Sequence, residues 1–198
     1  MKKMNIPNRL TVVRIALVPV FVVLMALSGM ADWIKYVALA VYVIASLTDY
    51  LDGYLARKKK IVTNFGKLMD PLADKILVAA GFIMIVGAGT IPAWMAVVVI
   101  GRDFILNTIR MFGKENGETI SAGVYGKIKT ASQMIGVSLA IIDTHSIFAF
   151  LELKKTMGVV PMLINVSMSI FITVALIFTI WSMIDYFMKY KKYIDIEK

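Results

Sequence analysis

The sequence contains no cysteine and only one histidine, His145. The missing cysteines exclude disulfide bonds, thiolate metal sites and a cysteine nucleophile. A covalent mechanism that needs a pair of histidines is excluded on similar grounds. Charged residues are also scarce, because they make up 18% of the 198 residues, whereas soluble domains have about 25%. The charges that remain are mostly basic, and 22 Lys and Arg residues against 13 acidic ones give a net charge of +9.

Hydrophobic residues make up 59% of the chain, against about 45–50% in a soluble domain. They gather in long runs, and neither residues 15–31 nor residues 159–184 contain a charged side chain. Runs of this length approach or exceed the roughly 20 residues that cross the hydrocarbon core of a bilayer. We therefore expect the bilayer to be the solvent for most of the chain, which forms one membrane domain over residues 1–198.

Charges, glycines and prolines divide the chain into six expected transmembrane helices, so the predicted fold class is all-α and polytopic. The expected spans cover about 11–30, 33–57, 66–87, 92–112, 126–142 and 158–187. Residues 1–10 are polar and basic, and we expect them to form an interfacial helix before the first span. The first apolar run leads directly into another one, which favours a retained span over a cleaved signal peptide.

Basic residues are distributed unevenly between the two sides of this arrangement. Six spans place both termini on one side, and 17 of the Lys and Arg residues fall on that side, against three on the other. Because basic residues accumulate in cytoplasmic loops, both termini are predicted to be cytoplasmic, in a multi-pass protein of the cell membrane. This asymmetry, together with attraction to anionic lipid, explains the net charge without a nucleic-acid partner.

Four aspartates fall within 26 positions, at the expected cytoplasmic ends of the second and third spans. Asp49 and Asp52 are three residues apart and Asp70 and Asp74 are four apart, so each pair projects from one face of its helix. Four carboxylates at one depth repel one another near a low-dielectric bilayer and need a counter-charge. Hard oxygen ligands suit Mg²⁺, Mn²⁺ or Ca²⁺, so we expect a divalent metal at this end of the two spans.

Simpler interpretations exist for this region. The acids can form a solvated rim that pairs with nearby basic residues, namely Arg57, Lys58, Lys67 and Lys75. Small residues lie beside the acids, at Gly53, Ala56 and Gly66. Small residues leave room for a ligand to approach the backbone, but they are also typical of close packing between membrane helices. Spacing alone leaves both interpretations of the small residues open.

Residues 49–74 read D-Y-L-D-G-Y-L-A-R, then eight residues, then G-K-L-M-D-P-L-A-D. This segment resembles the signature of the CDP-alcohol phosphatidyltransferases, and all eight fixed positions of that signature match at the expected spacing. The chain length and the six expected spans are similar to that family as well. Within the family, residues 5–14, 69–75, 101–103 and 126–130 resemble bacterial members that make phosphatidylglycerophosphate.

The resemblance implies a role for each signature residue. The aspartates Asp49, Asp52, Asp70 and Asp74 would bind a two-metal centre of Mg²⁺ or Mn²⁺, and Asp74 would also act as the general base for a direct displacement of CMP. Residues of the signature and of the amino-terminal segment would bind the donor, CDP-diacylglycerol: Gly53, Ala56, Arg57, Gly66, Asn8, Thr11 and Arg14. Helix capping and interfacial anchoring are the alternative for the last three. The family likeness also implies a homodimer.

The acceptor implied by this likeness is glycerol-3-phosphate, a dianion whose site needs cations. Four basic residues of the fourth and fifth spans are candidates for binding its phosphate: Arg102, Arg110, Lys127 and Lys129. An arginine within the membrane is costly unless it is paired or functional. For Arg102, a salt bridge with the neighbouring Asp103 is therefore an equally good interpretation.

Other functions stay open at this point. A member of the same family could use serine, inositol phosphate or phosphatidylglycerol as its acceptor, although serine would not require the basic residues of the fourth and fifth spans. Outside the family, a divalent-cation transporter or a structural membrane scaffold is possible. Transporter sites usually lie near the bilayer midplane, whereas these acids lie at one membrane edge. Release of CMP from CDP-diacylglycerol would distinguish the enzyme from both.

Overall fold

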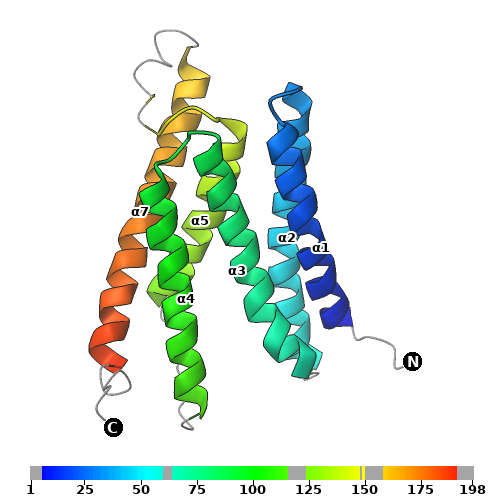
Figure 1. Ribbon diagram of the computed structural model, residues 1–198, viewed down its shortest axis with the longest axis vertical. Coiled ribbons are helices and arrows are strands. Elements are labelled where there is room, and N and C mark those ends of the chain that lie inside the picture. Colours follow the sequence, from blue (N-terminus) through cyan, green and yellow to red (C-terminus); the bar gives the residue numbers. More distant parts are fainter. Residues whose placement is uncertain (1–5, 60–63, 116–123, 148, 150–157, 191–198) are drawn as a thin grey trace. The chain divides into compact units, whose positions relative to one another are not determined.

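The computed structural model describes residues 6–59, 64–115, 124–147, 149 and 158–190. Within these residues the protein consists of helices and turns, without a strand, which confirms the predicted all-α fold class. The helices are α1 (Ile6–Leu27), α2 (Asp32–Lys59), α3 (Asn64–Gly87), α4 (Ala93–Glu115), α5 (Val124–Ile142) and α7 (Val159–Tyr190), shown in Figure 1.

The observed helices begin and end within five residues of the spans expected from the sequence. The largest difference is at the start of α1, because the helix already begins at Ile6, within the segment expected to be interfacial. Pro7 is compatible with this early start, since a first-turn N–H has no partner within the helix and proline lacks that N–H. Residues 6–10 therefore continue the first helix, and residues 1–5 lie outside the described part of the chain.

A glycine in the left-handed region follows the end of α3. Gly89 has a φ of 77°, and its N–H donates a hydrogen bond of 2.9 Å to the carbonyl oxygen of Val86. The N–H of Thr90 donates to the carbonyl oxygen of Ile85 at 3.0 Å. This pair of bonds satisfies carbonyl groups of the last helical turn, and the positive φ favours glycine two residues after the helix ends at Gly87.

The chain forms two compact units that are each assembled from separate stretches of sequence. The first unit comprises Met1–Thr90 and Val137–His145, and the second comprises Ile91–Gly136 and Ser146–Lys198. In the first unit, α1 contacts both α2 and α3, and α2 contacts α3. In the second unit, α4 contacts α7. Helix α5 contributes residues to both units.

The first unit is packed along regular stripes of buried residues. On α1 the buried positions alternate in steps of three and four, at Thr11, Arg14, Val18, Phe21 and Met25. That spacing forms one continuous stripe on a helix, of the kind that packs against a neighbouring helix. The ring of Phe21 lies against that of Tyr42 on α2, with 5.2 Å between the ring centroids.

The second unit shows the same spacing on α7, where the buried stripe consists of Asn165, Met168, Ile172, Ala175, Thr179, Ser182 and Tyr186. Helix α5 passes very close to this stripe. A Cβ atom added at Gly136 would lie 2.9 Å from Cγ1 of Ile172 and 3.3 Å from its backbone nitrogen. Only glycine allows so close an approach of the two backbones at this point.

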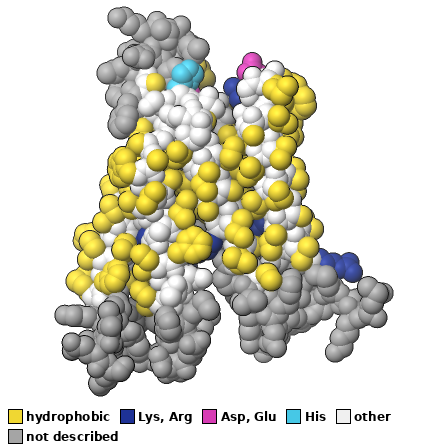
Figure 2. Space-filling view, in the orientation of Figure 1, with side chains coloured by type: hydrophobic (Ala, Val, Ile, Leu, Met, Phe, Trp, Pro, Cys, Tyr) yellow, Lys and Arg dark blue, Asp and Glu magenta, His cyan; other side chains and the backbone are white. Residues whose placement is uncertain are grey.

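Two helices of the described residues are long and apolar enough to cross a bilayer, judged by length and composition. They are Arg9–Leu27 of α1 and Val159–Met188 of α7, with mean hydropathies of 2.6 and 2.3. Only 28% of each is buried, whereas the core helix of a soluble protein is mostly buried. Figure 2 shows hydrophobic side chains over most of the visible sides of the helices. These features are those of a membrane protein.

The other four expected spans do not meet this criterion, so six transmembrane helices are not established by length and composition. The apolar part of α3, Lys75–Gly87, is shorter than a bilayer-crossing helix. Helices α2, α4 and α5 carry charged side chains within their length. The described residues therefore show an all-helical protein with two candidate membrane spans.

Candidate active site

The four signature aspartates lie on the two helices predicted to carry them. Helix α2 is continuous through Asp49 and Asp52, and α3 is continuous through Asp70 and Asp74, so the helical spacing within each pair is present. The two helices contact each other, and the end of α2 and the start of α3 lie at the same end of the first unit (Figure 1). The side chains of all four lie outside those that the structure describes, so the facing acid pairs stay a prediction.

The register of α2 supports the predicted position of its acid pair. The buried stripe of this helix runs through Ala38, Tyr42 and Ala45, in steps of four and three. The next two steps of four and three reach Asp49 and Asp52. Both acid positions therefore lie on the extension of the stripe that packs within the first unit.

Two of the predicted donor-binding residues, Thr11 and Arg14, are wholly buried on α1. They lie in the first half of α1, and this helix begins at the end of the first unit where α2 ends and α3 begins (Figure 1). A wholly buried arginine is not a solvated interfacial anchor, so that interpretation does not hold for Arg14. The side chains of the remaining predicted donor-binding residues, which are Asn8, Gly53, Ala56, Arg57 and Gly66, lie outside the described ones.

The side-chain oxygens of the four aspartates are suitable ligands for the predicted metal ions. Four carboxylates supply the hard oxygen ligands that Mg²⁺ and Mn²⁺ prefer. Among the side chains that the structure does describe, no group of three or more His, Cys, Asp or Glu residues could hold a metal ion. The single histidine, His145, lies in the turn after α5, where its Nδ1 is 2.5 Å from Oδ1 of Asp143.

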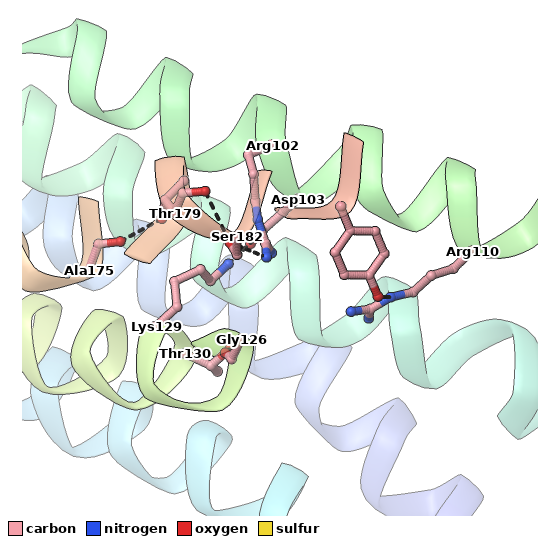
Figure 3. A network of polar contacts seen from close by, with 10 residues as sticks. Arg102, Asp103, Arg110, Gly126, Lys129, Thr130, Ala175, Thr179 and Ser182 are labelled. Carbon is pink, nitrogen blue, oxygen red and sulfur yellow. Dashed lines mark hydrogen bonds and ion pairs between the residues drawn. The ribbon is translucent and has the colours of Figure 1, made fainter. Parts of the chain in front are cut away.

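The second unit contains a buried ionic cluster that joins three helices (Figure 3). Arg102 of α4 donates a hydrogen bond of 2.8 Å to the carboxylate of its neighbour Asp103. Lys129 of α5 forms an ion pair with the same carboxylate oxygen. Each of these three side chains is at most 6% exposed. The salt bridge considered as the alternative for Arg102 is therefore present, and it extends to a second cation.

The same arginine also reaches α7. Arg102 donates a second hydrogen bond, of 2.7 Å, to the hydroxyl oxygen of Ser182. That hydroxyl in turn donates to the carbonyl oxygen of Thr179 at 3.0 Å, so its lone pairs face the guanidinium. Buried charges are tolerated when they are paired and hydrogen-bonded in this way. The cluster holds α4, α5 and α7 in one register.

Arg110 lies two turns beyond Arg102 on α4 and has a different kind of partner. Its Nε donates a hydrogen bond of 2.8 Å to the phenolic oxygen of Tyr186 on α7. The guanidinium carbon also lies 5.3 Å from the centroid of the tyrosine ring. Because phenol is neutral, this contact fixes the guanidinium without neutralising its charge.

The two lysines predicted to bind the acceptor occupy opposite sides of α5. Lys127 and Lys129 are two residues apart, which corresponds to about 200° around a helix. Lys129 is buried and paired with Asp103, whereas Lys127 is exposed. Of the four predicted cations, the structure thus brings Arg102 and Lys129 together at one carboxylate and places Arg110 and Lys127 elsewhere in the second unit.

Two residues of this region, Ser182 and Tyr186, were not among those predicted from the sequence. A signal for them exists, because both fall on the buried three-and-four stripe of α7, together with Thr179. A polar side chain on the packed face of an otherwise apolar helix needs a partner within the protein. The three-and-four spacing of polar residues within the apolar sequence of α7 is thus the signal that indicates them.

Comparison with known proteins gives concordant results. The model of the CDP-alcohol phosphatidyltransferase family matches residues 4–181. The chain is 43% identical to the CDP-diacylglycerol–glycerol-3-phosphate 3-phosphatidyltransferase of Bacillus subtilis, over 70% of this chain and 77% of that protein. It is 35% identical to the protein of the same name from Haemophilus influenzae, over 93% of this chain and 92% of that protein. A similarly named protein of Arabidopsis thaliana is 31% identical over 91% of this chain and 81% of its own length.

Proposed function

Because the chain belongs to the CDP-alcohol phosphatidyltransferase family, we propose that it transfers the phosphatidyl group of CDP-diacylglycerol to glycerol-3-phosphate. The products are phosphatidylglycerophosphate and CMP, and the reaction belongs to phospholipid biosynthesis. The choice of glycerol-3-phosphate as acceptor rests on the similarity to relatives that are named for the same transfer. This similarity extends over most of this chain and most of each relative.

The reaction is a direct displacement at phosphorus. The hydroxyl oxygen of glycerol-3-phosphate bonds to the β-phosphorus of CDP-diacylglycerol, and the bond between this phosphorus and the bridging oxygen of CMP breaks. The proton of the hydroxyl passes to the carboxylate of Asp74, and CMP leaves with the electron pair. Asp49, Asp52, Asp70 and Asp74 would hold Mg²⁺ or Mn²⁺. Bound there, the ions would supply positive charge next to the pyrophosphate and the leaving group.

The donor is bound by residues of the first unit. Arg57 suits a phosphate of the CDP moiety, because a guanidinium can bind two phosphate oxygens at once. Arg14 and Thr11 offer further polar groups from the buried stripe of α1. The small residues Gly53, Ala56 and Gly66, together with Asn8, complete the proposed set.

The acceptor's phosphate is bound by cations of the second unit. Arg110 and Lys127 are the better candidates, because the described partner of Arg110 is a neutral phenol and Lys127 is exposed. Arg102 and Lys129 share the carboxylate of Asp103, so we assign them a supporting role in holding α4 and α5 beside the acceptor. The phosphate would then bind to cations that have no carboxylate partner among the described residues.

Several properties of the protein as a whole belong to this proposal. The chain is a multi-pass protein of the cell membrane, with both termini and the acid positions on the cytoplasmic side, supported by the 17-to-3 distribution of basic residues. It forms a single membrane domain, supported by the one family model that matches residues 4–181. It acts as a homodimer, as its family membership suggests.

An acceptor panel tests the proposed function. Purified protein is supplied with CDP-diacylglycerol, Mg²⁺ and one of four acceptors, namely glycerol-3-phosphate, serine, inositol phosphate or phosphatidylglycerol, and release of CMP is measured. We expect turnover with glycerol-3-phosphate to exceed that with the other three. Faster turnover with another acceptor would contradict the acceptor and leave the family assignment intact. Absence of CMP release with all four would contradict the proposed reaction itself.

A further inference from the structure

The bond between Arg110 and Tyr186 uses a particular edge of the guanidinium. The donor is Nε, and the phenolic oxygen that accepts lies 2.8 Å away. The two terminal nitrogens, Nη1 and Nη2, make no hydrogen bond to any residue that the structure describes. Within the described part of the chain, Arg110 is therefore held through Nε, and the paired donors at its tip have no described hydrogen-bond partner.

The tyrosine that holds Arg110 is itself fixed. Tyr186 is 6% exposed and forms a small apolar cluster with Leu106, against which Ile109 packs. Both partners lie on α4, within one turn of Arg110. The phenolic oxygen accepts the hydrogen bond from Nε of Arg110, and the guanidinium carbon lies 5.3 Å from the centroid of the ring. A ring packed in this way gives its hydroxyl a defined direction, so the hydrogen bond sets the orientation of the guanidinium.

This geometry suits a phosphate with two or three terminal oxygens. The tip of a guanidinium offers two parallel N–H groups, which match two oxygens of a phosphate or carboxylate. A free arginine side chain loses rotamer entropy when it adopts one orientation, and a partner that fixes it beforehand reduces this cost. A carboxylate partner would do the same but would also neutralise the charge, as Asp103 does for Arg102.

We propose that Tyr186 is a positioning residue that orients Arg110 for the phosphomonoester group of the acceptor. This inference rests on the proposed function for the identity of the acceptor, and it adds a residue that determines acceptor specificity. Tyr186 acts through its hydroxyl and through Arg110, without touching the phosphate. Acceptors that lack a phosphate gain nothing from this arrangement.

The test replaces Tyr186 by Phe, which keeps the packed ring and removes the hydroxyl. Affinity for glycerol-3-phosphate is measured by calorimetry on the purified protein without donor, so it does not depend on turnover. Steady-state CMP release gives KM for both substrates, kcat and the inhibition constant of inorganic phosphate. Tyr36→Phe is the matched control, because Tyr36 is 54% exposed at the start of α2 in the first unit.

We expect Tyr186→Phe to weaken glycerol-3-phosphate binding about fivefold, as the loss of one hydrogen bond implies. KM for glycerol-3-phosphate and the inhibition constant of inorganic phosphate should rise by a similar factor. KM for CDP-diacylglycerol and kcat should stay close to their wild-type values, and Tyr36→Phe should change none of them. A merely structural role would instead lower kcat and the midpoint of thermal unfolding without a selective change in acceptor affinity, which would overturn the proposal.

A double-mutant cycle tests whether the effect passes through Arg110. Arg110→Lys keeps the positive charge but has no Nε donor for the phenol to hold. In that background Tyr186→Phe should have no further effect on glycerol-3-phosphate affinity. An undiminished fivefold effect in the Arg110→Lys background would overturn the proposal. Normal acceptor binding in a wild-type protein that releases no CMP would instead contradict the proposed reaction.

Discussion

The carboxylate of Asp103 on α4 forms a buried ion pair with Lys129 on α5, two residues that are 26 positions apart in the sequence. Asp103 is 5% exposed and Lys129 is 1% exposed, so water screens this pair very little. Arg102 binds the same carboxylate oxygen. The single negative charge of Asp103 thus forms ion pairs with two cations, Arg102 and Lys129, within the second unit.

Removing that negative charge should destabilise the protein. Asp103→Asn preserves the shape of the side chain but leaves Arg102 and Lys129 buried without their carboxylate. Breaking a buried pair by removing one partner costs about 3–5 kcal/mol, because the remaining charge is uncompensated. We expect a clear drop in the midpoint of thermal unfolding of the purified protein in detergent.

Two further variants show whether a loss of stability in Asp103→Asn comes from the buried ion pair. Lys129→Met should cost less than Asp103→Asn, since Arg102 still neutralises the carboxylate. Asp32→Asn, at the exposed first residue of α2, should change the midpoint little, because substitutions at exposed positions usually change stability by less than about 0.5 kcal/mol. Equal stability of the Asp103→Asn variant and the wild-type protein would show that the ion pair contributes nothing to the fold.

Arg110→Ala and Lys127→Ala should each raise KM for glycerol-3-phosphate and leave KM for CDP-diacylglycerol nearly unchanged. A charge-assisted hydrogen bond to phosphate is worth about 1.5–3 kcal/mol, so the expected increase is roughly tenfold or more. Steady-state CMP release measures both constants. Lys35→Ala is the control, since Lys35 lies at the other end of α2 from the acid positions and over the ring of Tyr36. An unchanged acceptor KM in both variants would refute the assignment.

Removal of divalent metal should abolish turnover. The proposed site brings four carboxylates close together, and the pyrophosphate of the donor adds further negative charge, so a divalent cation is the expected counter-charge. Dialysis against EDTA should stop CMP release, and addition of Mg²⁺ or Mn²⁺ should restore it. Full activity in metal-free buffer would exclude the proposed two-metal centre.

Asp74→Asn should lose turnover to a greater extent than it loses binding of CDP-diacylglycerol. A general base typically contributes about 10²–10⁴-fold to the rate, so we expect kcat to fall by at least two orders of magnitude. Donor affinity can be followed by equilibrium binding of CDP-diacylglycerol in detergent, with Asp32→Asn as the control for a generic loss of charge. Near-normal kcat would show that another group accepts the proton.

Reporter fusions test the proposed topology. A reporter fused after Lys198 should be cytoplasmic, and one inserted near Lys154 should be on the opposite side, as the distribution of basic residues indicates. A second cytoplasmic fusion in the segment 60–63 would serve as an internal control. The same location for Lys198 and Lys154 would refute six spans, which length and composition leave open for four of the helices.

Much of the helical framework was predictable because its signals are local. The third expected span ends at residue 87, and α3 does end at Gly87, two residues before Gly89 with its φ of 77°. The apolar run 159–184 marked the last helix, observed as Val159–Tyr190. A helix end depends on residues within one or two turns of it, so a sequence contains that information directly.

The sequence by itself determined the helix boundaries to within five residues, the family, and the helical spacing of the four aspartates, since each depends on neighbouring residues or on a short motif. Only the tertiary structure decided how the predicted acceptor cations are partnered. Arg102 meets Ser182 across 80 positions, and Arg110 meets Tyr186 across 76. Such contacts depend on the register in which two packed helices lie, which no spacing within either helix specifies. Because of that register, Arg102 and Lys129 share a carboxylate and Arg110 donates to a phenol. Lys127, the fourth predicted cation, is exposed.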